Sequence, residues 1–170
     1  DMTPLERKRA MESLLFLVEK RDGKIKAWTC ANGSTQREYI KREDATSPMA
    51  ATYAILITGV LDVKQHQDVM TNDVPNAFVQ TPIPQDGEKF IMKIRGKLVD
   101  MLVEISPETY ESFIVYEGNK QVLYVRMLRA LYGMLVSSIL YYKKFRKDIE
   151  GIGFTVNPYD PCVANRMVGT

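Results

Sequence analysis

Asp73 is the acidic residue whose position could support chemistry. It lies near the end of a predicted strand at 69–74, and Pro75, which cannot continue a strand ladder, directly follows that strand. A carboxylate at a strand end is an oxygen ligand of the kind that Mg²⁺ binds. Taken alone, the pattern favours a simpler interpretation, a carboxylate that caps a turn. A metal-binding role for Asp73 therefore needs support from the rest of the sequence.

Basic residues gather toward the C-terminal side of the sequence. Residues 121–150 contain six bases and two acids, whereas residues 73–120 contain five bases and eight acids. A basic segment beside an acidic one suits a protein that holds a phosphate backbone near a metal site. Lys143, Lys144 and Lys147 share one side of a predicted helix and are the candidate phosphate contacts. On charge alone, a solvated helix face remains the favoured interpretation.

Histidine and cysteine offer little further chemistry. His66 is the only histidine and lies in a polar stretch, which excludes Ser-His-Asp and Cys-His arrangements and favours a loop position. Cys30 and Cys162 are far apart and lack metal-ligand spacing, so the sequence predicts two inert thiols in a reducing compartment and no zinc site. The apolar runs are too short to cross a membrane, and no signal peptide is expected.

The elements that must position these residues mix helices and strands irregularly, which predicts the α+β class. The 170 residues are 45% hydrophobic, enough to bury the core of one domain. The pattern Thr3-Pro4-Leu5-Glu6 predicts a capped helix that continues to about Arg21. The other expected elements are a strand at 24–30, a helix after Ser47-Pro48, strands at 69–74, 90–94 and 122–125, two short helices in 97–117, a helix at 137–150 and a strand near 163–168.

Five short motifs follow one another along the sequence. They are Lys26-Ala27-Trp28-Thr29-Cys30, Ser47-Pro48-Met49-Ala50, Asp73-Val74-Pro75-Asn76-Ala77-Phe78, Leu131-Tyr132-Gly133-Met134-Leu135-Val136, and Gly153-Phe154 followed by Asp160-Pro161-Cys162. In this order they resemble the motifs of the copia-type retrotransposon reverse transcriptases. Each motif is weak alone, but five in register are strong, and the resemblance covers about residues 20–168.

The resemblance implies the fingers and the first part of the palm of a right-hand polymerase, with an incomplete antiparallel palm sheet. Its expected divisions are an N-terminal helix at 1–22, a fingers-like segment at 23–66 and a partial palm, with a fingers insertion, at 67–170. The palm strands would be those near 69–74, 122–126 and 163–168.

The resemblance also implies RNA-directed DNA synthesis by two-metal nucleotidyl transfer, with two Mg²⁺ ions in the complete enzyme. Asp73 would be the catalytic carboxylate and metal ligand, and the carbonyl of Val74 would be a second ligand. The expected nucleotide-binding residues are Lys26, Phe78, Tyr132 and Gly133, where Phe78 would reject a ribose 2′-hydroxyl. Core packing remains the alternative for Phe78 and Tyr132, and a plain surface lysine for Lys26.

The resemblance further implies the partners and location of the parent protein. RNA template, DNA primer and dNTPs would be bound, and integrase and ribonuclease H would be neighbours in a polyprotein. The expected location is a cytoplasmic virus-like particle with a possible nuclear stage, without a membrane and without secretion.

Three departures from the family pattern bear on activity. The family's adjacent aspartates should follow the Asp160-Pro161-Cys162 motif within a few tens of residues, but the sequence contains no Asp-Asp pair. Because one carboxylate cannot hold two metals, the fragment is expected not to polymerise by itself. Trp28 replaces an arginine expected over the triphosphate, and Val136 replaces a glutamine near the nucleotide.

The first residue is Asp1, which suggests a piece cut from a longer reading frame. Two alternatives stay open: a non-catalytic nucleic-acid-binding remnant of a decayed element, and a fragment with no function.

Overall fold

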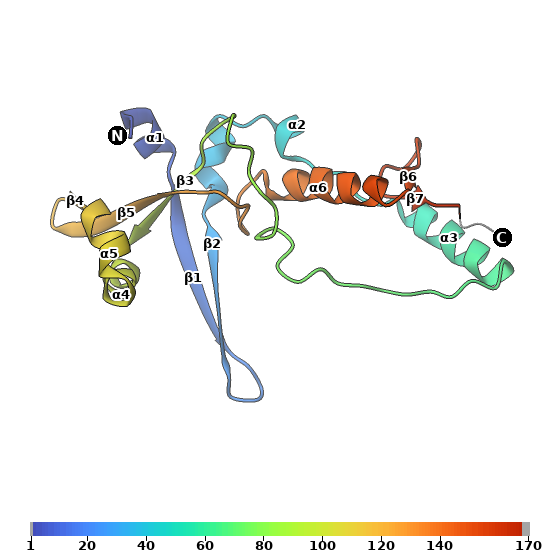
Figure 1. Ribbon diagram of the computed structural model, residues 1–170, viewed down its shortest axis with the longest axis horizontal. Coiled ribbons are helices and arrows are strands. Elements are labelled where there is room, and N and C mark those ends of the chain that lie inside the picture. Colours follow the sequence, from blue (N-terminus) through green and yellow to red (C-terminus); the bar gives the residue numbers. More distant parts are fainter. Residues whose placement is uncertain (1, 168–170) are drawn as a thin grey trace.

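The computed structural model describes residues 2–167 and shows an α+β fold built on a five-stranded mixed sheet (Figure 1). The strands are β1 (Met11–Glu19), β2 (Ile25–Ala31), β3 (Ile91–Arg95), β4 (Val115–Glu117) and β5 (Lys120–Arg126). Their order in the sheet is β2-β1-β3-β5-β4. The α+β class is therefore confirmed. The expected antiparallel sheet is corrected to a mixed one, because β1 and β3 run parallel where Met11 pairs with Met92.

Helices and a small second sheet complete the described fold. The helices are α1 (Pro4–Arg9), η1 (Gly33–Glu38), α2 (Arg42–Ala45), α3 (Thr52–Lys64), α4 (Lys97–Ile105), α5 (Pro107–Tyr110), η2 (Glu111–Phe113) and α6 (Ser137–Gly151). The small sheet pairs β6 (Thr155–Val156) with β7 (Ala164–Asn165). The elements predicted at 24–30, 90–94, 122–125 and 137–150 are thus confirmed, with bounds shifted by a few residues. The helices predicted within 97–117 are present as α4 and α5, but residues 115–117 form the strand β4. None of the helices within residues 2–167 has the length and apolar character that a membrane span requires.

The predicted N-terminal helix begins correctly and ends too late. The Thr3 hydroxyl oxygen accepts the Glu6 N–H, and the Glu6 carboxylate accepts the Thr3 N–H, which completes the capping box. The helix ends at Arg9, and residues 11–19 form β1, which pairs with β2 to make a hairpin. The run from Leu14 to Val18 is continuously apolar, and such a run fits a strand as well as a helix. The helix expected to continue to about Arg21 is therefore wrong beyond Arg9, because residues 11–19 pair with β2 as a strand.

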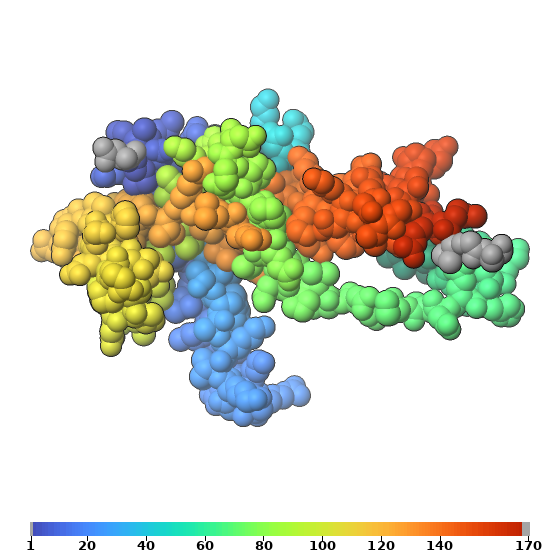
Figure 2. Space-filling model, viewed as in Figure 1, coloured from blue at the N-terminus to red at the C-terminus, as the bar shows by residue number. Residues whose placement is uncertain are grey.

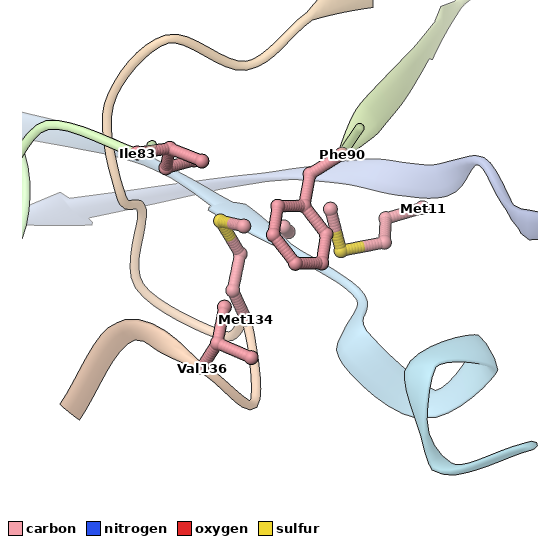
Figure 3. Packing of buried hydrophobic residues seen from close by; sticks show 6 residues of the cluster. Met11, Ile83, Phe90, Met134 and Val136 are labelled. Carbon is pink, nitrogen blue, oxygen red and sulfur yellow. The ribbon is translucent and has the colours of Figure 1, made fainter. Parts of the chain in front are cut away.

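Two clusters of buried side chains hold the sheet to its surroundings. The first joins the hairpin base, the segment around Phe90 and the start of α6, and consists of Met11, Ala31, Ile83, Phe90, Met134 and Val136. Figure 3 shows the Phe90 ring pointing toward the side chains of Met11 and Met134. The second cluster packs Met92, Ile94 and Leu123 of the sheet against Val99 of α4. The first cluster is the one that brings distant segments of the chain together.

Two predicted elements differ in the region expected to form the palm. Residues 67–74 pair with no strand in the described part of the chain, and Val69 and Met70 are exposed. An apolar stretch forms a strand only where a neighbouring strand completes its hydrogen bonds, and β5 pairs with β3 and β4 instead. The strand expected near 163–168 is limited to β7 among the described residues, and residue 168 lies outside them.

The helix α3 also departs from expectation. It begins at Thr52, with Ala51 as its N-cap residue, and not at Ser47-Pro48. Apolar side chains such as Ile55, Leu56 and Val60 are more than half exposed around it. Figure 2 shows the segment that follows α3 running back to the body of the molecule as a single line of chain. A helix that is apolar on all sides is normally buried, so α3 has the surface of an internal helix.

Candidate functional site

Asp73 lies in the exposed segment 67–74, directly before a compact turn at 75–80. Asn76 takes a left-handed conformation with φ 53°, which asparagine tolerates. The Gln80 side-chain amide donates to the Pro75 carbonyl at 2.7 Å, and the Thr81 hydroxyl donates to the Ala77 carbonyl at 2.9 Å. The turn is therefore well ordered, and the carboxylate of Asp73 precedes it in solvent.

No group of three or more His, Cys, Asp or Glu side chains within residues 2–167 is arranged to hold a metal ion. The two oxygen ligands expected from the sequence, the Asp73 carboxylate and the Val74 carbonyl, come from adjacent exposed residues. They fit part of an Mg²⁺ shell, which takes oxygen ligands and keeps several waters.

The turn after Asp73 places Phe78 against Tyr132. The two ring centroids lie 4.8 Å apart with an interplanar angle of 54°, a favourable tilted contact. The Phe78 ring also makes a T-shaped contact with Tyr141 on α6, with centroids 6.1 Å apart, and Tyr141 stacks on Phe145 with centroids 5.8 Å apart. Two candidate residues that are distant in the sequence are thus in direct contact. Tyr132 keeps 41% of its surface exposed, so this contact lies at the surface of the molecule.

Gly133 fixes the loop that carries Tyr132 to the end of β2. The Ala31 N–H donates to the Tyr132 carbonyl at 2.8 Å. Gly133 has φ +89°, and a Cβ added there would lie 2.0 Å from the Ala31 carbonyl oxygen. The backbone of Gly33 lies equally close to the loop, since a Cβ added to Gly33 would lie 2.3 Å from the Gly133 carbonyl oxygen. Only glycine fits these two backbones, so the role of Gly133 in this structure is close packing.

Gln36 is a second anchor of the same loop, and sequence reasoning missed it. Its side-chain oxygen accepts the Leu135 N–H at 2.7 Å, and the residue is fully buried. Its amide nitrogen has no hydrogen-bond partner among the described residues. Gln36 directly precedes the charged segment 37–46, and no pattern in the sequence distinguishes it from its exposed polar neighbours.

Asp160 joins two further motifs. One of its carboxylate oxygens accepts the Ala51 N–H at 3.0 Å, and the other accepts the Cys162 N–H at 2.9 Å. Burial, together with the nearby charge of Asp160, raises the pKa of the Cys162 thiol, which keeps that thiol protonated. The Asp160 carboxylate therefore links the segment before α3 to the loop between β6 and β7. Asp160 is 7% exposed, and its role in this structure is structural.

Lys26 and Trp28 lie on the hairpin, away from the Phe78–Tyr132 contact. The Lys26 ammonium lies 5.5 Å from the Trp28 ring centroid, and Trp28 stacks on Phe16 of β1. Lys24 pairs with Asp22 at 3.6 Å in the exposed turn. No hydrogen bond or ion pair of the described residues joins Lys26 to Asp73, Phe78 or Tyr132, so the expected nucleotide-binding set is brought together only in part.

The three candidate lysines of α6 differ from one another. Lys143 and Lys147 are exposed, whereas Lys144 is half-buried and pairs with Asp148 at 2.5 Å. Arg146 pairs with Glu150 at 2.9 Å on the same helix, and its pKa is raised by that hydrogen bond. Lys143 and Lys147 are therefore the α6 lysines most available to a phosphate backbone.

Val136 is a core residue in this structure. It is 7% exposed and packs with Met134 and Phe90 in the first cluster. The replacement of a glutamine near the nucleotide by Val136 stays a prediction, and the structure places the Val136 side chain in this apolar cluster. A glutamine at position 136 would have to place its side-chain amide inside this apolar cluster or push the neighbouring side chains of the cluster apart.

A partly buried ionic group joins β3, β4 and β5, with the Lys93 side chain covered and the Glu117 side chain about a third exposed. The Lys93 ammonium contacts the Glu117 carboxylate at 2.6 Å, and the Tyr124 hydroxyl donates to the same carboxylate. The hydrogen bond from Lys93, then that from Tyr124, lowers the pKa of Glu117. Burial acts to lower the pKa of Lys93, but hydrogen bonds with Glu117 and Tyr124 outweigh it and leave that pKa raised. This group stabilises the β3–β4–β5 part of the sheet in its charged form.

Comparison with known proteins returned no match: no family model matches the sequence, and neither a curated protein nor a solved structure matches it significantly.

The contacts group the five sequence motifs into two sets. The motifs at 73–78 and 131–136 meet through Phe78 and Tyr132, and the loop at 131–136 also docks on the end of β2. The motifs at 47–50 and 160–162 meet through Asp160 and the adjacent Ala51. The first set joins a solvent-exposed carboxylate, two aromatic rings and a glycine-dependent loop.

Proposed function

We propose that this chain is the fingers and the first part of the palm of a copia-type reverse transcriptase, an RNA-directed DNA polymerase. The observation that carries the proposal is the contact between Phe78 and Tyr132, whose ring centroids are 4.8 Å apart. Residues from two motifs of the family pattern are adjacent in space, as a nucleotide site formed by both motifs requires.

The proposed mechanism assigns one role to each residue of this set. Asp73 and the carbonyl of Val74 would hold Mg²⁺, and the bound ion would supply charge to polarise phosphate oxygens and activate the 3′-hydroxyl. Phe78 closes on the sugar and excludes a 2′-hydroxyl by its bulk, with Tyr132 supporting its ring. Gly133 lets the loop backbone approach β2, which sets the position of Tyr132. Lys26, on the hairpin, reaches phosphate only after the hairpin moves or another segment brings the nucleotide to it.

The proposed partners are an RNA template, a DNA primer and dNTPs, with integrase and ribonuclease H in the same polyprotein. A cytoplasmic virus-like particle is the proposed location. Exposed Lys143 and Lys147 on α6 support contact with a phosphate backbone.

Primer extension by the protein encoded in the reading frame that contains this chain tests the proposal. Asp73→Asn should reduce Mg²⁺-dependent dNTP incorporation at least about a hundredfold, because a metal ligand is removed. Asp68→Asn, in the same exposed segment, is the matched control and should retain activity. Phe78→Ala should admit ribonucleotides that the unchanged protein rejects. Equal activity of the Asp73→Asn and Asp68→Asn variants would contradict the role of Asp73.

A nucleic-acid-binding remnant is the second candidate, favoured by the exposed lysines of α6. It requires steeply salt-dependent binding of an RNA–DNA hybrid without any incorporation. Binding that Lys143→Ala and Lys147→Ala weaken, combined with inactivity of the encoded protein, would favour this candidate over the polymerase.

A further inference from the structure

An open cavity is lined by α4, β3, the base of the β1–β2 hairpin and the segment 126–131. Figure 1 shows α4 and the hairpin on either side of β3. The volume of the cavity is about 470 Å³, within the range of about 300–1,000 Å³ that small-molecule sites occupy in proteins. Its walls are mostly aliphatic and include Met92, Ile94, Leu98, Leu102, Met127 and Leu131. The cavity therefore has the size and the lining of a ligand site.

The inner walls of this cavity belong to elements that packing holds in place. Met92 and Ile94 are both buried and lie on the same face of β3, because alternate residues of a strand share a face. Leu98 and Leu102 are one turn apart on α4, and both are half-buried. They lie beside Val99, which packs the helix against the sheet. The apolar walls are therefore fixed before any ligand enters.

Arg129 places one positive charge at the open side of the cavity. It lines the cavity and is exposed, and its guanidinium donates to the Gln80 carbonyl at 3.0 Å. An arginine has five N–H donors, so this bond leaves others available. Among residues 2–167, no carboxylate pairs with Arg129. Arg126 also lines the cavity, but it shares a face of β5 with Tyr124, away from α4. Arg129 is therefore the cation that this site offers to a ligand.

We propose that this cavity binds a free fatty acid of medium chain length, with the tail among the leucine and methionine side chains and the carboxylate on Arg129. Among residues 2–167, no side chain that lines the cavity is aromatic or acidic. The cavity thus offers no ring on which an aromatic ligand could stack, whereas methionine side chains adapt to a flexible aliphatic tail. A single guanidinium is complementary to a single carboxylate.

This inference goes beyond the polymerase proposal and does not rest on it, because it uses none of Asp73, Phe78 and Tyr132. Leu131 lines the cavity directly before Tyr132, so a bound acid would bridge α4 and the segment that leads into the 131–136 loop. Asp73→Asn should leave the affinity for a fatty acid unchanged. Failure of either proposal can therefore be observed separately.

Isothermal titration calorimetry of the chain with hexanoate, octanoate and decanoate, each below its micelle concentration, tests the proposal. Each added methylene group should tighten binding up to about fourfold, because it transfers apolar surface out of water. The heat-capacity change on binding should be negative. Octanol has the same tail length as octanoate without the charge, and it should bind about threefold to tenfold more weakly than octanoate.

Two variants locate the ligand. Leu102→Trp should fill the cavity and abolish binding of octanoate. Met101→Trp, at an exposed position of α4 outside the cavity lining, is the matched control and should bind like the unchanged chain. Arg129→Gln should weaken binding of octanoate about threefold to tenfold and leave the affinity for octanol unchanged. Arg129→Gln also decides the question if Leu102→Trp fails a circular-dichroism test of folding.

Three results would overturn the proposal. The first is the absence of any heat of binding with decanoate. The second is equal affinity of Leu102→Trp and Met101→Trp for octanoate, or an affinity that Arg129→Gln leaves unchanged, since either result would place the ligand elsewhere. The third is equal affinity of the unchanged chain for octanoate and octanol, which would identify a neutral apolar ligand as the occupant.

Discussion

Replacing Gly133 with alanine should destabilise the protein through two separable effects. The left-handed conformation at φ +89° costs an alanine about 1–2 kcal/mol. The new Cβ would lie 2.0 Å from the Ala31 carbonyl oxygen, so the two backbones must separate. Separation breaks the 2.8 Å bond from Ala31 to Tyr132, which contributes about 0.5–1.5 kcal/mol. The expected loss in the free energy of unfolding is therefore about 1.5–3.5 kcal/mol.

Urea unfolding measures this loss, and Gly153→Ala provides the matched control. Gly153 has a similar φ of +91°, but its added Cβ would meet the Arg166 side chain at 3.5 Å, an ordinary contact. The control should lose only the conformational part, about 1–2 kcal/mol. Equal losses in the two variants would refute the close approach between the 131–135 loop and β2.

Two further predictions concern other contacts of the fold. Asp160→Ala should lower the free energy of unfolding by about 1–3 kcal/mol, because the amides of Ala51 and Cys162 lose their acceptor. Asp148→Ala, at an exposed position of α6, is the control. Equal losses of stability for the two variants in urea unfolding would refute the role of Asp160 in joining these segments. The pKa of Glu117 is lowered in the folded state, so its stabilisation is present above the unfolded pKa and is lost as pH falls through the lower folded pKa. Glu117→Gln should accordingly flatten the decline of the melting temperature in acid, and an unchanged acid profile would contradict the assigned partners.

Much of the sheet and its helices could be predicted from local signals. The capping box at Thr3, the turn glycine at Gly23 and the proline at 107 each mark an element boundary that the structure contains. Most elements from 90 to 151 agree with the prediction because their boundaries coincide with glycine, proline or a change in polarity, whereas β4 lies where a helix is expected.

Errors arose where partners decide the conformation. The apolar run at 14–18 is compatible with helix or strand, and its pairing with residues 26–30 makes it a strand. The stretch at 69–74 has the composition of a strand, but no neighbouring strand pairs with it in the described part of the chain. Local sequence cannot report whether a partner strand is present.

The sequence motifs predicted several residues of the candidate site but not all of the contacts that these residues make. The motif pattern named Phe78, Tyr132 and Gly133, which the structure brings together around the end of β2. It did not indicate Gln36 or the structural role of Asp160, since both depend on backbone amides contributed by distant segments. The motif pattern also predicts Lys26 as a nucleotide-binding residue, but Lys26 lies on the β1–β2 hairpin, away from Phe78.

The reading frame beyond Thr170 tests the central claim, a reverse transcriptase origin, most directly. The claim predicts an apolar residue followed by two aspartates within about forty codons, the reach of one hairpin and its flanking loops. A stop codon or frameshift within that distance would favour the nucleic-acid-binding remnant. An open frame that continues well past this distance without paired aspartates would contradict the claim.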